Sequence, residues 1–126
     1  MNQYHLCIIC LGSNHQGIEH LKKVEKELKE ISCNICWGNI IETEAEGTVV
    51  SCSYFNRAAL LQTTLSKSLL ITEFKKIEYR HGRTHSCKQK GIISLDIDLL
   101  MYDDEIVKPA DLKKKYVQLA LQSIPL

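Results

Sequence analysis

The stretch that decides the fold is residues 91–105, GIISLDIDLLMYDDE, an apolar run interrupted by two aspartates. Its length and its branched apolar side chains predict a β-strand. Successive side chains of a strand alternate between its two faces. One face should therefore carry Ile93, Leu95, Ile97, Leu99 and Met101. Asp96 and Asp98 are then expected side by side on the opposite face.

This aspartate pair needs an explanation, because aspartate is disfavoured in strands and like charges on one face repel. Two carboxylates on one strand face can converge on a hard cation. Mg²⁺ is typically held by one or two carboxylates together with substrate phosphates and water. From the residues alone, a magnesium site and a solvated sheet face are about equally well supported for Asp96 and Asp98.

The composition predicts a single domain over residues 1–126, long enough to bury a core of its own. The formal net charge is +1, so no global field would recruit nucleic acid or an anionic membrane. The sequence has no apolar run of membrane-spanning length and no secretory leader pattern. We therefore expect a cytoplasmic protein, a monomer, whose six cysteines are reduced.

Four of the cysteines form two Cys-x-x-Cys pairs, Cys7 with Cys10 and Cys33 with Cys36. Such spacing approaches that of a zinc ribbon. The first pair, however, lies inside the apolar segment YHLCIICL, which reads as a strand, and residues three apart on a strand face opposite sides. The pattern therefore favours small buried apolar side chains over a zinc site, which stays the minor alternative.

The remaining elements follow from hydrophobic spacing and from helix start and stop signals. The predicted strands cover 4–11, 36–43, 54–64 and the opening stretch, and the predicted helices cover 15–31, a segment between the Ser66 cap and Gly82, and 110–124. The order β-α-β-β-α-β with a C-terminal helix predicts an α+β, ferredoxin-like fold. Such a fold has a mostly antiparallel sheet with helices packed on one face, which leaves the other face for a site.

Two further groups of residues have side chains suited to ligand binding. A basic loop before the aspartates contains Arg83, His85, Lys88 and Lys90, which could clamp a polyphosphate. Tyr54 and Asn56 alternate onto one strand face, where a ring could stack on a flat heterocycle and an amide could pair with its edge. A solvated loop and ordinary packing are the simpler readings of each residue taken singly.

Together, the segments GSN, YFNRAALLQT, LLITEFKKIEYRHGR and SLDIDLLMYDDE resemble the 6-hydroxymethyl-7,8-dihydropterin pyrophosphokinase family of folate biosynthesis. The most specific feature is E-x-x-x-G-R followed, twelve residues after the arginine, by L-D-I-D. The resemblance covers residues 4–126. It implies transfer of diphosphate from ATP to the pterin hydroxymethyl group with release of AMP, and two Mg²⁺ ions that bridge the ATP phosphates.

The resemblance also implies roles for individual residues. The aspartate pair, Asp96 and Asp98, would hold both metal ions, and Arg83 would meet the phosphates. The pterin would be bound by Tyr54, Asn56, Tyr116, Thr43 and Gly12. The nucleotide would be bound by Glu78, Arg83, His85 and Lys114.

The sequence also departs from the family's usual pattern. Ile93 stands where the family has an arginine that engages ATP phosphate, and Lys90 stands where it has a tryptophan. A Pro-His segment is missing between Asp104 and the last helix, and Glu44-Ala45-Glu46 replaces proline and apolar residues. Loss of one charge-assisted contact in the transition state costs ~10²–10³ in rate. A weakened homologue that binds a pterin-like heterocycle without efficient ATP use is therefore the alternative.

Overall fold

The computed structural model describes residues 4–14, 17–44, 53–82 and 95–125. Within these ranges the chain forms a six-stranded antiparallel sheet with the strand order β2-β4-β1-β5-β6, and β3 also pairs with β4. The strands are β1 (His5–Ser13), β2 (Asn34–Trp37), β3 (Ile41–Glu44), β4 (Ser53–Thr63), β5 (Asp96–Tyr102) and β6 (Glu105–Ile106). This order and pairing confirm the predicted α+β, ferredoxin-like class.

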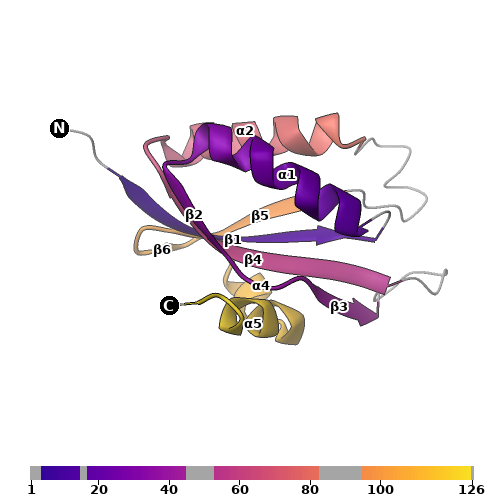
Figure 1. The fold of residues 1–126 in the computed structure, drawn as a ribbon. Coiled ribbons are helices and arrows are strands. Elements are labelled where there is room, and N and C mark those ends of the chain that lie inside the picture. The colour runs from indigo at the N-terminus through magenta and orange to yellow at the C-terminus, as the bar shows by residue number, and fades with distance from the viewer. Residues whose placement is uncertain (1–3, 15–16, 45–52, 83–94, 126) are drawn as a thin grey trace.

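Two long helices, α1 (Gly17–Ile31) and α2 (Lys67–Arg80), lie side by side on one face of the sheet (Figure 1). The main core forms between them and the sheet, and it contains the predicted apolar positions Leu21, Val24, Leu28, Leu70, Phe74 and Ile77. The Oγ of Ser66 accepts a hydrogen bond from the Leu69 amide and caps α2, as expected. Gly82, with a φ of 87°, ends that helix in the left-handed region that glycine tolerates.

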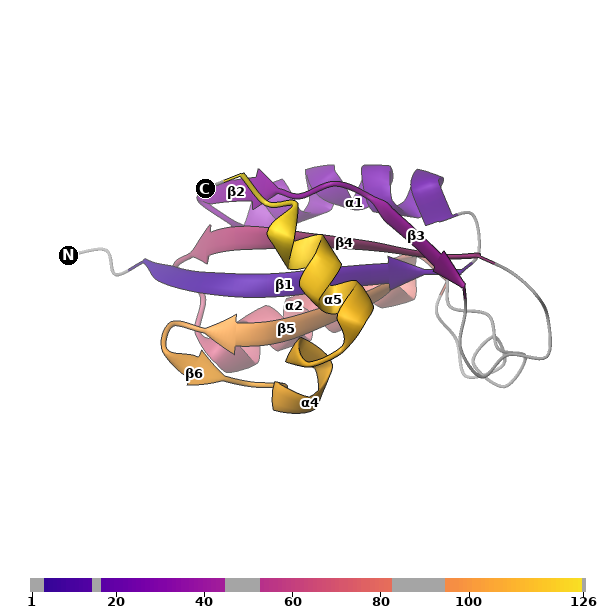
Figure 2. The ribbon, with the colours of Figure 1, turned by 90° about the horizontal axis from the view of Figure 1, so that it is seen from below.

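The opposite face is less open than the sequence predicted. The short helices α4 (Pro109–Leu112) and α5 (Lys115–Gln122) lie against it, and α5 crosses beneath β1 and β4 (Figure 2). Val117 of α5 packs with Cys10 and Leu100, and Ala120 packs with Ala58. The face is thus partly covered, because α5 has its own apolar stripe to bury.

The prediction of one strand over 36–43 was wrong, since two strands, β2 and β3, occupy that region and both pair with β4. The break falls at Gly38, where the chain passes close to α5. A Cβ at Gly38 would lie 2.6 Å from Ser123 Oγ and 3.1 Å from the Ala120 carbonyl oxygen. The amide of Asn39 donates to the same Ser123 hydroxyl at 2.9 Å.

The prediction of one helix over 110–124 was also wrong. Lys114 has extended backbone angles (φ −66°, ψ 137°) and separates α4 from α5. The break lets α4 lie beside β5 while α5 crosses the sheet.

The strand alternation around the aspartates holds up to Leu99, and Leu95, Ile97 and Leu99 all enter the main core. Between Leu99 and Met101 the pairing with β1 shifts by one residue. This bulge turns Tyr102, rather than Met101, toward the main core, where the Tyr102 hydroxyl donates to the Leu65 carbonyl at 2.7 Å.

The first cysteine pair lies as predicted. Cys7 is buried in the main core and Cys10 in the cluster under α5, on opposite faces of β1. Both thiols are free, as are those of Cys33 and Cys36, which lie nearer the surface. None of the described helices is long and apolar enough to cross a membrane.

Candidate active site

The predicted site residues gather at one end of the sheet, where β1 and β3 end and β4 and β5 begin. A single cross-strand row contains Asn56 of β4, Gly12 of β1 and Asp96 of β5, because Gly12 pairs with both other residues. Neighbouring strands lie ~4.8 Å apart, so the asparagine and the aspartate are separated by roughly 10 Å across the glycine. The row therefore has an amide at one end and a carboxylate at the other, and its middle residue has no side chain of its own.

Gly12 leaves room for the ring of Tyr54. A Cβ at Gly12 would overlap the Tyr54 hydroxyl and would lie 2.6 Å from Tyr54 Cζ. The ring meets that of Tyr116, on α5, edge to face at a centroid distance of 6.3 Å. Burial, and then the charge of Asp96, raise the pKa of the Tyr54 hydroxyl, which keeps it protonated at neutral pH. The Tyr54 ring thus fills the space above Gly12, and Tyr116 lies against that ring.

Asn56 is the buried polar residue of this row, with 1% of its surface exposed. Its Nδ2 has no hydrogen-bond partner among the described residues. A buried amide without a partner costs about 1–3 kcal/mol, so such groups commonly mark a place where a ligand or water completes the bond. In the register of β3 and β4, Asn56 pairs with Ile41, and Thr43 pairs with Tyr54.

The aspartate pair lies on the α5 face, as the alternation predicted, with Asp98 opposite Cys10 and Asp96 opposite Gly12. Burial, and then the charge of Asp96, raise the pKa of Asp98, and the two carboxyl groups are close enough to hydrogen-bond. The same negative charges, added to burial, raise the pKa of the Cys10 thiol to about 12. A cation at this position would relieve the repulsion between the carboxylates.

A lysine that sequence reasoning did not single out contacts this pair. Lys108 Nζ forms an ion pair with Asp98 Oδ1. Burial lowers the pKa of the Lys108 amine, but the hydrogen bond to Asp98 and the charge of Asp98 raise it, and the net pKa is raised. No local pattern predicts this contact, because Lys108 lies in a connecting segment. Lys114, by contrast, pairs with Asp111 at 3.1 Å and stands 5.8 Å from the centre of the Tyr116 ring.

Glu78 lies apart from the row, buried on α2 with 8% of its surface exposed. Its Oε2 accepts a hydrogen bond of 2.7 Å from the backbone amide of Ile97, the residue between the two aspartates. The structure therefore shows Glu78 holding the strand that carries Asp96 and Asp98. Its predicted nucleotide-binding role remains a prediction.

Several predicted residues fall outside the described ranges: Arg83, His85, Lys88, Lys90 and Ile93. The site as described is therefore the part formed by the sheet and α5. Of the residues assigned to pterin or metal, it brings together Gly12, Thr43, Tyr54, Asn56, Asp96, Asp98 and Tyr116.

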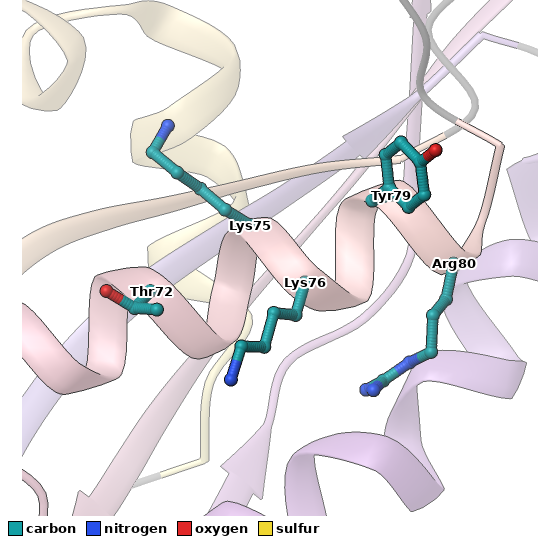
Figure 3. Close-up of a pocket in the computed structure, with 5 residues that line it drawn as sticks. All are labelled: Thr72, Lys75, Lys76, Tyr79 and Arg80. Atoms are coloured by element: carbon teal, nitrogen blue, oxygen red, sulfur yellow. The ribbon is translucent and has the colours of Figure 1, made fainter.

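A shallow pocket elsewhere on the molecule is formed entirely by α2. It is lined by Thr72, Lys75, Lys76, Tyr79 and Arg80. Figure 3 shows these side chains pointing in different directions from one helix, with the lysine and arginine ends apart. This pocket lies on the helix layer, on the other side of the sheet from the aspartates, and shares no residue with the row of Asn56, Gly12 and Asp96.

A magnesium ion is chemically compatible with the aspartate pair. In the described ranges, no group of three or more His, Cys, Asp or Glu side chains could hold a metal ion by itself. Two carboxylates are nevertheless what Mg²⁺ uses when substrate phosphates and water fill its other positions. The resident Lys108 ammonium indicates that this position favours a cation.

Comparison with known proteins gives a consistent match. A family model described as 7,8-dihydro-6-hydroxymethylpterin-pyrophosphokinase matches residues 8–125. The chain is 39% identical over 101 residues to a "Folate synthesis bifunctional protein" of Chlamydia muridarum, which covers 75% of this chain and 22% of that protein. It is also similar to proteins named "2-amino-4-hydroxy-6-hydroxymethyldihydropteridine pyrophosphokinase". That of Aquifex aeolicus is 30% identical over 104 residues (82% of this chain, 64% of the relative), and that of Haemophilus influenzae 29% over 103 residues (79% and 64%).

Proposed function

The chain belongs to the 7,8-dihydro-6-hydroxymethylpterin-pyrophosphokinase family, and on this premise we propose that it transfers diphosphate from ATP to 6-hydroxymethyl-7,8-dihydropterin and releases AMP. The chain spans 64% or less of the length of the curated relatives described above. The observation that supports the proposal is the row of Asn56, Gly12 and Asp96, which puts a buried amide and a carboxylate on one sheet face.

The pterin would lie beside the Tyr54 ring, which itself covers Gly12. The unpartnered Asn56 amide would donate to an acceptor on the pterin edge, and Tyr54 and Tyr116 would contact its ring. Thr43, which pairs with Tyr54, would contact the pterin from β3. An aromatic and amide-lined pocket of this kind fixes a flat heterocycle by stacking and by directed hydrogen bonds.

Phosphoryl transfer would take place at the aspartate end of the row. The hydroxymethyl oxygen of the pterin forms a bond to the β-phosphorus of ATP, the bond from that phosphorus to the oxygen of the α-phosphate breaks, and the hydroxyl proton passes to solvent. Asp96 and Asp98 would hold Mg²⁺, two ions being expected, whose charge neutralises the phosphates. The protein's own contribution is orientation, because the row separates the two substrates by a fixed span of the sheet.

The test is AMP formation by the purified protein with 6-hydroxymethyl-7,8-dihydropterin, ATP and Mg²⁺, combined with calorimetry of each ligand. We expect AMP to appear only when both substrates are present. Asp96→Asn and Asp98→Asn are expected to lower the rate by ~10²–10³ and to weaken binding of MgATP, while pterin binding is kept. Asp104→Asn, an exposed aspartate in the following turn, is the matched control and should behave as the wild type.

Two outcomes would contradict the proposal. If the aspartate variants bound MgATP normally, the metal assignment would be wrong. If the protein bound pterin and formed no AMP, it would be the weakened homologue that Ile93 and Lys90 suggest from the sequence. Nothing within the described residues favours that second reading.

A cytoplasmic location, a monomeric state and the absence of nucleic-acid partners remain predictions from the sequence.

A further inference from the structure

We propose that Lys108 is the resident counter-ion of the aspartate pair, and that it binds the ATP phosphates once Mg²⁺ has displaced it from Asp98. The proposal rests on the proposed function for the identity of the nucleotide. The contact itself does not, since Lys108 Nζ already pairs with Asp98 Oδ1 in the structure.

The backbone around Lys108 is fixed to the strand that carries the aspartates. The amides of Val107 and Lys108 both donate to the Leu100 carbonyl, at 2.8 and 3.4 Å. Leu100 lies on the same face as Asp98, two residues further along β5. The stem of Lys108 therefore starts next to the aspartate face, and only its side chain is free to change position.

The charges around Lys108 explain why it rests on Asp98. Asp98, Asp96 and Asp111 all attract its ammonium group. The other lysine of this region, Lys114, is paired with Asp111. Among the described residues, Lys108 is thus the cation in contact with the aspartate pair.

Mg²⁺ and an ammonium group compete for the same carboxylate oxygen. Mg²⁺ requires close oxygen ligands in a near-octahedral arrangement, so its binding to the pair displaces the weaker lysine contact. The Lys108 side chain is 44% exposed and has a flexible four-carbon stem, which lets the ammonium follow negative charge. A triphosphate held beside the aspartates supplies that charge, and lysine is a common phosphate ligand.

The exchange predicts opposite changes in two affinities, which an ordinary surface ion pair or a folding role would not produce. In Lys108→Met, Mn²⁺ alone should bind about two- to fivefold more tightly, because its competitor has been removed. MgATP should bind about tenfold more weakly, because a charged phosphate contact is lost. Lys108→Arg keeps the charge and should change either affinity less. Mn²⁺ binding is measured by electron paramagnetic resonance and MgATP binding by calorimetry, both without pterin.

Lys67→Met is the matched control, since Lys67 forms a comparable exposed ion pair with Glu105 at 2.9 Å, away from the aspartates. It should leave both affinities unchanged. The proposal is overturned if Lys108→Met changes neither affinity, weakens both or strengthens both. If Lys108→Met shows these opposite changes but the wild-type protein forms no AMP, the proposed function is refuted and the role of Lys108 is supported.

Discussion

At the scale of single residues, Gly12 decides whether the candidate site can exist. Its missing Cβ is the space that the Tyr54 ring occupies, since an added methyl would lie 2.6 Å from Tyr54 Cζ. Gly12→Ala should therefore push the Tyr54 ring away, because the hydroxyl end of that side chain can shift more easily than the backbone. We expect pterin binding, measured by calorimetry, to weaken at least tenfold, with a stability loss of about 1–3 kcal/mol.

Gly38→Ala separates this effect from general destabilisation. Its Cβ would crowd Ser123 and the Ala120 carbonyl on α5, outside the row of site residues. It should lower the free energy of unfolding in urea by a similar amount and leave the pterin affinity within about twofold, since overpacking is felt locally. Equal losses of pterin affinity in the two variants would show that Gly12 has no special role at the site.

At the scale of elements, the position of β5 depends on a buried carboxylate on α2. Glu78 Oε2 accepts the Ile97 amide at 2.7 Å. Glu78→Ala leaves that amide without this acceptor and should cost about 1–3 kcal/mol in urea unfolding. It should also weaken Mn²⁺ binding, because Ile97 lies between Asp96 and Asp98. Glu78→Gln keeps a carbonyl acceptor and should restore most of both losses. If Gln were as damaging as Ala, the charge of Glu78, and not this hydrogen bond, would be what matters.

The elements also show which features the sequence could predict. The shared face of Asp96 and Asp98 was predictable, because strand alternation is fixed by backbone geometry. The bulge near Leu100 was not predictable, since Leu99, Leu100 and Met101 are all apolar and their order does not show which of them faces the core. The break at Lys114 was hidden for a related reason: Leu112 and Tyr116 keep a helical spacing across it. Gly38 was a usable sign of the break between β2 and β3, because an isolated glycine in a strand often marks close backbone approach.

The candidate site was predictable in the same unequal way. The strand positions of Tyr54, Asn56 and Asp96 could be predicted, because each lies on a regular strand, and their binding roles stay predictions. The position of Lys108 could not be predicted, since its contact with Asp98 depends on how the segment after β6 (Glu105–Ile106) turns back onto β5. Long-range contacts of that kind depend on tertiary geometry that no local pattern encodes.

At the scale of the whole molecule, the two layers share the central strand β1. Cys7 points into the core under α1 and α2, and Cys10 into the cluster under α5. Burial, assisted by Asp103 for Cys7 and chiefly by Asp98 for Cys10, raises their pKa values to about 11 and about 12 from an ordinary value of 9.0. Because one strand carries both thiols, ionisation of either works against the packing of the entire sheet.

The consequence is a fold that weakens in alkali. Below pH 9 both thiols keep their protons in the folded and the unfolded state, so they add no pH dependence. Above pH 9 the unfolded chain releases protons that the folded chain retains, so stability falls as pH rises toward the folded pKa values. Because of these two thiols, the free energy of unfolding in urea should be about 2–3 kcal/mol lower at pH 10 than at pH 8.

Cys7→Ala and Cys10→Ala should each remove about half of that difference. The cavity that each leaves does not matter, because its cost is present at both pH values. Cys33→Ala, at an exposed position, should leave the difference between pH 8 and pH 10 unchanged. The assignment would be contradicted if Cys33→Ala lost the pH dependence, or if Cys7→Ala and Cys10→Ala both kept it in full.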